Sequence, residues 1–66
     1  MIDVARLEPG AKLRLRNGIT AEVVENPEDG MWVMVRYITV PDDPAAAGTE
    51  DLCHADQILE VLGDAA

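Results

Sequence analysis

The sequence contains no phenylalanine, one tryptophan and one tyrosine, so its hydrophobic core must consist of aliphatic side chains. Its single cysteine, Cys53, cannot form an intramolecular disulfide, although small secreted domains usually need several. The longest uninterrupted apolar run, Met31 to Val35, is far too short to cross a membrane. The N-terminal residues also lack the basic and apolar segments of a signal peptide. These absences predict a cytoplasmic protein.

Basic residues are also scarce, with five against thirteen acidic residues and a net charge of −8. Residues 1–18 hold four basic and two acidic residues (net +2), whereas residues 19–66 hold one and eleven (net −10). A negative field of this size repels phosphate backbones and anionic lipids. We therefore expect neither nucleic acid nor a membrane as a partner. The acidic surface either keeps the protein in solution or binds a basic partner.

An apolar content of 48 % over 66 residues is nevertheless typical of a folded chain. The length allows a single domain, residues 1–66, and is too short for the deep cleft of most enzymes. We therefore predict one domain without enzymatic activity and without a cofactor. Its terminal segments, residues 1–6 and 63–66, are expected to be loose.

The alternation of apolar and charged residues from Ala11 to Arg16 predicts a half-buried strand. The following Asn17-Gly18 is typical of a two-residue hairpin loop, but such a loop would place Glu22 on the apolar face. A three-residue loop, residues 16–18, keeps the faces consistent, with Gly18 at positive φ closing a bulge. This register pairs Leu15 with Ile19, Leu13 with Ala21, Ala11 with Val23 and Lys12 with Glu22.

A second strand is expected from Ile19 to about Glu25, and a turn over residues 26–30 leads to a third strand, Met31 to Val40. If Val24 lies opposite Trp32, alternate residues of the third strand face the interior. These inward residues are Val33, Val35 and Tyr37, opposite Val23, Ala21 and Ile19. The outward residues are Trp32, Met34, Arg36 and Ile38, together with Val24.

Residues 41–48 contain two prolines and predict a surface loop, but the segment from Thr49 to Leu62 is compatible with two structures. Apolar residues at helical spacing slightly favour a helix that ends at Gly63. The alternative is a strand over residues 50–54, one helical turn over residues 55–57 and a last strand over residues 58–62.

This second arrangement resembles the small SH3-like barrels of many bacterial proteins. Ala55-Asp56-Gln57-Ile58 is similar to the Ala-Asp-Gln-Leu-like motif that ends a bacterial domain of unknown function. The spacing from Gly48 to Val61 also resembles the C-terminal part of the plasmid-borne type II dihydrofolate reductases. The resemblance implies an all-β, five-stranded SH3-like barrel with one short helical turn before the last strand. The alternative is an α+β fold, a three-stranded antiparallel sheet with a C-terminal helix.

The reductase function does not follow from this resemblance. That family binds substrate and cofactor through a Val-Gln-Ile-Tyr segment in the central pore of a tetramer. The matching positions here are Glu50-Asp51-Leu52-Cys53, which lack the amide and the aromatic hydroxyl and add two carboxylates. Carboxylates in such a pore would repel the phosphates of NADPH. A reductase is thus the least favoured function.

Cys53, His54 and Asp56 are residue types that bind metals or act in nucleophilic catalysis. One cysteine and one histidine cannot complete a four-ligand zinc site in a monomer, and adjacent strand residues point to opposite faces. The pair Asp42-Asp43 lacks the further spaced oxygen ligands of a calcium loop. We therefore predict no catalytic residue and no metal site.

The outward stripe of the third strand is the candidate partner-binding surface, because tryptophan, methionine and arginine are enriched at interface cores. The alternative is that a loop or the N-terminal Ile2 and Val4 cover it. The sequence predicts a non-enzymatic binding or assembly module whose protein partner is a second copy (a homo-oligomer) or another protein. A second hypothesis is an acidic inhibitor that mimics nucleic acid, as in phage and mobile-element proteins. The predicted contact residues are Val24, Trp32, Met34, Arg36 and Ile38, and the predicted acidic surface is Glu28, Asp29, Asp42 and Asp43.

Overall fold

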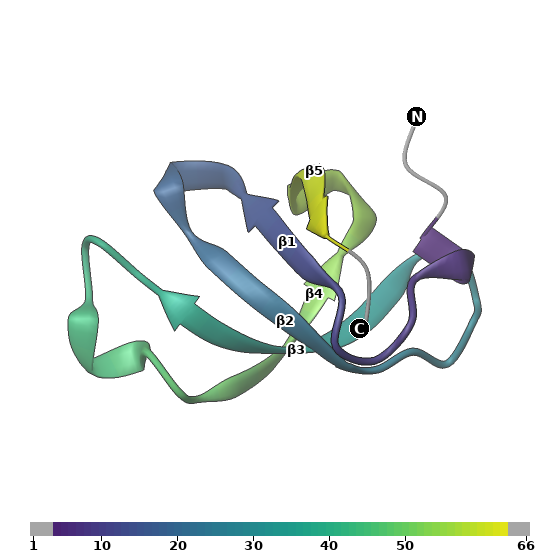
Figure 1. Ribbon diagram of the computed structural model, residues 1–66, viewed down its shortest axis with the longest axis horizontal. Coiled ribbons are helices and arrows are strands. Elements are labelled where there is room, and N and C mark those ends of the chain that lie inside the picture. The colour runs from purple at the N-terminus through teal and green to yellow at the C-terminus, as the bar shows by residue number, and fades with distance from the viewer. Residues whose placement is uncertain (1–3, 64–66) are drawn as a thin grey trace.

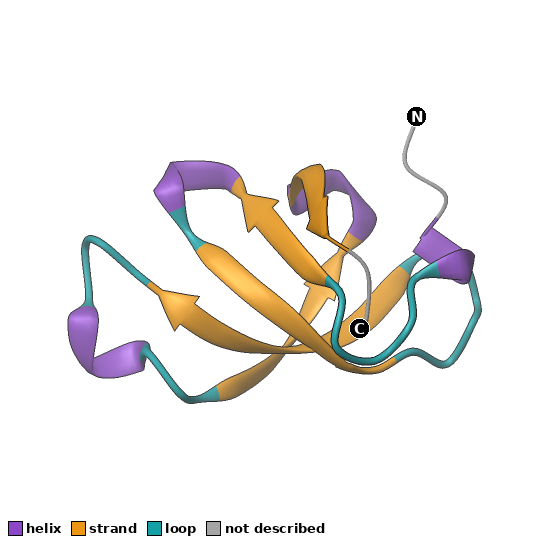
Figure 2. Ribbon diagram, in the orientation of Figure 1, coloured by secondary structure: helices purple, strands orange, loops and turns teal. Residues whose placement is uncertain are grey.

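Five strands joined by short loops and 3-10 turns make up the computed structural model, which describes residues 4–63 (Figures 1 and 2). No α-helix occurs in that range, so the helical alternative for residues 49–62 is wrong. The strands are β1 (Lys12–Leu15), β2 (Thr20–Glu25), β3 (Trp32–Thr39), β4 (Glu50–His54) and β5 (Ile58–Gly63). The 3-10 turns are η1 (Val4–Arg6), η2 (Arg16–Gly18), η3 (Pro44–Ala46) and η4 (Ala55–Gln57).

The strands form one antiparallel sheet in the order β4-β3-β2-β1-β5. β4 and β5 are consecutive in sequence but lie at opposite edges of this sheet. His54 and Ile58 are only four residues apart, which limits the distance between their Cα atoms to about 14 Å. The sheet must therefore curve strongly to bring its two edges together at η4 (Figure 1). It is not closed, so the all-β prediction is confirmed and the barrel is not.

The first hairpin has the predicted register, with Leu13 opposite Ala21 and Lys12 opposite Glu22. The backbone N–H of Leu15 donates to the carbonyl of Ile19 at 2.7 Å, which closes the three-residue loop η2. Gly18 has a φ of 74°, a conformation that glycine adopts without steric cost. No register shift interrupts the ladder between β1 and β2, so the bulge expected at Gly18 is not part of that ladder.

The predicted register between β2 and β3 is wrong by two residues. Val23 lies opposite Val35 and Ala21 opposite Tyr37, instead of opposite Val33 and Val35. Side chains alternate along a strand, so a shift of two leaves every residue on its predicted face. The sequence could not determine this pairing because the long loop after Asn26 imposes no register, and the ladder also shifts between Val23 and Glu25.

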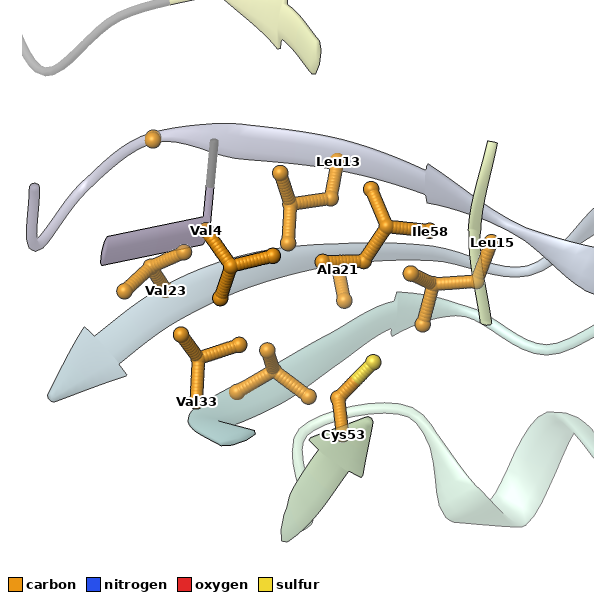
Figure 3. Packing of buried hydrophobic residues seen from close by; sticks show 10 residues of the cluster. Val4, Leu13, Leu15, Ala21, Val23, Val33, Cys53 and Ile58 are labelled. Carbon is orange, nitrogen blue, oxygen red and sulfur yellow. The ribbon is translucent and has the colours of Figure 1, made fainter. Parts of the chain in front are cut away.

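The core lies inside the curve of the sheet, where side chains from all five strands and from η1 converge (Figure 3). Asn26 anchors η1, because its side-chain amide donates to the carbonyls of Val4 at 2.9 Å and Leu7 at 2.8 Å. Val4 is buried and Gly63 is the last residue of β5, whereas residues 1–3 and 64–66 of the segments expected to be loose lie outside the described residues. The buried apolar residues are Val4, Ala11, Leu13, Leu15, Ala21, Val23, Val33, Val35, Cys53 and Ile58.

Candidate protein-binding surface

Apolar side chains gather on the outer face of β3 and β4. The ladder places Trp32 opposite His54 and Met34 opposite Leu52. The rings of Trp32 and His54 make an edge-to-face contact with centroids 4.7 Å apart. Trp32 is 39 % exposed and Leu52 is 51 % exposed, so the cluster is open to solvent. We call these four residues the Trp32 patch.

A row of ion pairs runs across the same face and limits the Trp32 patch on one side. Arg36 and Glu50, the next pair of the β3–β4 ladder, form an ion pair at 2.8 Å. Lys12 and Glu22 continue the row across β1 and β2 at 3.3 Å. Ile38 is 44 % exposed but lies beyond this row, so Arg36 and Glu50 separate it from the patch.

Val24 also lies apart from the patch. The ladder between β2 and β3 shifts at this residue, and its side chain lines a groove of about 650 Å³ between residues 5–9 and 24–28. Of the predicted contact residues, the structure thus brings together only Trp32 and Met34, with Arg36 at their border. Val4 packs in the core and does not cover the patch, and Ile2 lies outside the described residues.

The predicted acidic residues lie at opposite ends of β3. Glu28 and Asp29 precede this strand, and Asp42 and Asp43 follow it. A strand of eight residues is about 26 Å long, so the two pairs do not form one continuous surface. Asp29 has a local structural role, because its carboxylate accepts hydrogen bonds from the backbone N–H groups of Met31 at 2.8 Å and Trp32 at 3.0 Å. These bonds, the one to Trp32 above all, lower the pKa of Asp29.

Three other features give the Trp32 patch a negative border. Glu25 is the cross-strand neighbour of Met34. The carboxylate of Asp56 lies 3.6 Å from Nδ1 of His54. Asp29 contacts the backbone at Trp32, as described above. Two arginines also lie near the patch, but both are engaged: Arg36 is paired with Glu50, and Nε of Arg16 donates to the backbone carbonyl of Asp56 at 3.1 Å. A ligand bound here would therefore meet an apolar centre within an acidic ring.

The sequence analysis missed Leu52 and His54 as members of this surface. Both face outward only if residues 50–54 form a strand that pairs with β3, and the helical spacing of the segment obscured that possibility. The strand alternative could have predicted them, because a strand over residues 50–54 places Leu52 and His54 together on the face opposite to Cys53.

Cys53, His54 and Asp56 do not form a metal site. Cys53 points into the core and is 1 % exposed, whereas His54 lies on the outer face. Burial, with a smaller contribution from the charge of Asp51, raises the pKa of the Cys53 thiol to about 11. Within residues 4–63, no group of three histidine, cysteine or acidic side chains is arranged to hold a metal ion.

No protein-family model, curated protein or solved structure was found to match this chain. None of the helical turns between Val4 and Gly63 is long and apolar enough to cross a membrane. The chemistry of the surface itself is therefore the basis for a functional proposal.

Proposed function

We propose that this protein is a non-enzymatic, cytoplasmic binding module that holds a protein partner on the Trp32 patch. The observation that carries this proposal is the exposure of Trp32 and Leu52, with the half-buried Met34 beside them, on one face of the sheet. Contiguous apolar groups on a small domain are typical of association surfaces, and tryptophan contributes strongly to binding when it becomes buried.

The charge around the patch supports a partner segment that is both apolar and basic. Glu25, Asp29 and Asp56 surround the apolar centre, and the chain as a whole carries a net charge of −8. Lysine or arginine side chains on the partner would be attracted to this border and would set its orientation. The alternative, an inhibitor that mimics nucleic acid, rests on the net charge of residues 19–66. The apolar centre of the Trp32 patch favours a partner that buries apolar side chains over a basic site that normally binds phosphates.

The experiment compares the immobilised protein with two single-lysine variants in a pull-down from cell extract. Met34→Lys introduces a charge at the centre of the patch. Ile38→Lys is the matched control, since it places the same charge on the same strand beyond the Arg36–Glu50 pair. We expect the unmodified chain and Ile38→Lys to retain basic proteins at low salt, and Met34→Lys not to retain them.

Two results would contradict the proposal. One is retention of the same proteins by Met34→Lys and by the unmodified chain. The other is retention of proteins that depends on the patch but shows no excess of lysine and arginine in those proteins. That result would contradict the proposal that the partner is basic. Trp32 emission would report whether each variant keeps the fold, because the indole lies in contact with β4.

A further inference from the structure

The two edge strands of the sheet, β4 and β5, differ in how their free backbone groups are satisfied. An edge strand presents unpaired N–H and C=O groups, to which a strand of another chain can add. Proteins commonly block such edges with charged side chains or local hydrogen bonds. In this chain only one of the two edges is blocked.

On β4, side chains occupy two of the three N–H groups that face the free edge. The backbone N–H of Tyr37 donates to the carbonyl of Thr49, and the backbone N–H of Ala55 donates to the carbonyl of Met31. The backbone groups of alternate residues in this segment therefore point toward β3. The intervening Glu50, Leu52 and His54 direct their backbone groups to the free edge. The N–H groups of Leu52 and His54 are capped there. The carboxylate of Asp51 accepts from Leu52 at 2.8 Å, and the amide oxygen of Gln57 accepts from His54 at 3.3 Å.

Asp51 also accepts a hydrogen bond from the Tyr37 hydroxyl at 3.4 Å, which fixes the position of its carboxylate. A strand that approached β4 would have to displace both caps and would meet the charges of Glu50 and Asp51. β4 is therefore unfavourable for strand addition.

On β5 no side chain of the described residues bonds to the backbone edge. Ala11 and Leu15 exchange hydrogen bonds with β2, so Arg14 faces β5, where its partner is Glu60. Backbone N–H and C=O groups of successive strand residues point alternately to the two sides, so those of Leu59 and Val61, which flank Glu60, point away from β1. Three apolar side chains surround these free groups: Leu59 at 49 %, Val61 at 36 % and Leu62 at 50 % exposure.

The core is also incompletely covered along β5. Val61 lies opposite Leu13, which is fully buried, so both side chains belong to the inner face of the sheet. Val61 nevertheless stays partly exposed because β5 is the last strand of the sheet at this edge. A further strand along β5 would satisfy the free backbone groups and bury Val61 at the same time.

The charge of β5 is compatible with a second copy of this chain, despite the net charge of −8. The only charged side chain of the strand, Glu60, forms an ion pair with Arg14 at 3.2 Å. Within residues 58–63, two copies can therefore pair without bringing unpaired carboxylates together. At β4 they would meet with Glu50 and Asp51 on both sides.

We propose that β5 pairs antiparallel with β5 of a second copy to form a two-fold dimer, while the caps from Asp51 and Gln57 prevent the same pairing at β4. Identical antiparallel strands form a self-complementary interface, which closes at two copies. The dimer would bury Leu59, Val61 and Leu62 and leave the Trp32 patch free for its partner.

Light scattering over a wide range of protein concentrations tests this proposal. The unmodified chain should reach the mass of two chains, and Leu59→Lys should shift it to the mass of one. Leu52→Lys is the matched control, because Leu52 has nearly the same exposure as Leu59 but lies on the capped edge. It should leave the dimer intact. A monomer at all concentrations, or a dimer lost with Leu52→Lys but not with Leu59→Lys, would overturn the proposal.

Amide hydrogen exchange of the unmodified chain supplies a second readout that needs no variant. The N–H groups of Leu59 and Val61 should exchange more slowly as the protein concentration rises, and exchange independent of concentration would contradict β5 pairing. Failure of this dimer would not affect the proposed partner site, which is tested separately through Met34 and Ile38.

Discussion

Asp29 is an acidic residue whose role only the hydrogen bonds reveal. Its carboxylate terminates the loop before β3 by accepting from two backbone N–H groups, which lowers its pKa from 3.8. A lowered pKa means that the stabilisation is present above pH 3.8 and is lost as the pH falls through the folded-state pKa. We expect Asp29→Ala to be less stable than the unmodified chain at pH 7, and the difference to shrink in acid as the carboxylate loses its charge. Urea unfolding at several pH values measures this difference.

Asp29→Asn is the control for this prediction. The asparagine side-chain oxygen can still accept both N–H groups, but it does not titrate. Its stability should thus lie between those of the unmodified chain and Asp29→Ala at pH 7. A difference between Asp29→Ala and the unmodified chain that is undiminished well below the folded-state pKa would show that the carboxylate charge is not responsible.

Cys53 should be chemically inert in the folded chain, because its side chain is buried and its pKa is raised to about 11. We expect thiol reagents to modify it rapidly in urea and only very slowly in native buffer at pH 8. The double variant Leu52→Cys/Cys53→Ala moves the thiol one residue along β4 to the exposed face and should react at once. Rapid native reaction of the unmodified chain would contradict the burial.

The same raised pKa predicts a loss of stability at high pH. The unfolded thiol ionises near pH 9.0, whereas the folded thiol keeps its proton to about pH 11. The folded state therefore binds more protons between these values, and the free energy of unfolding falls as the pH rises through them. Urea unfolding of Cys53→Ala should lack this part of the pH dependence.

At the scale of elements, the caps on β4 determine whether association stops at two copies. Removing both caps with Asp51→Ala/Gln57→Ala would give each molecule two free edges. A molecule with one free edge forms a closed pair, but one with two free edges forms open chains. We expect this variant to produce large, concentration-dependent assemblies, visible by light scattering. Asp42→Ala/Asp43→Ala is the control, because it removes two acids from a loop and should stay as small as the unmodified chain.

The elements differ in how far the sequence predicts them. Between β1 and β2, strict alternation and a short loop leave only one register that keeps Leu13 and Ala21 on the same face. Between β2 and β3 the loop is longer, so the faces could be predicted but the pairing could not. Over residues 50–62, helical and strand periodicities coexist, and contact with β3 and β1 decides between them.

At the scale of the whole molecule, the net charge of −8 opposes folding and dimerisation but favours the binding of a basic partner. Salt screens the repulsion among the acids. We expect the Tm of the chain to rise with added sodium chloride, and the β5 dimer to become tighter. Binding of a basic partner to the Trp32 patch should weaken over the same range, because salt screens that attraction.

Asp42→Asn/Asp43→Asn is the matched variant for this prediction, since it removes two of the eight net negative charges without touching either surface. Its Tm should be higher at low salt and should depend less on salt. A dimer that weakens with salt would show that charge attraction, rather than strand pairing between two acidic chains, holds it together.

The amino-acid pattern by itself determined the first hairpin and the outward direction of Trp32 and Met34, because these follow from nearest neighbours and from the two-residue period of a strand. The all-β class also depended on the contacts of residues 50–62 with β3 and β1, because the pattern of that segment is compatible with a helix as well. The tertiary structure decided which residues stand beside Trp32 and Met34. Leu52 and His54 join the Trp32 patch, and Ile38 and Val24 leave it, only through the pairing of strands distant in sequence. The difference between the capped β4 edge and the open β5 edge has the same origin, since it depends on where Asp51, Gln57 and Glu60 find their partners in space.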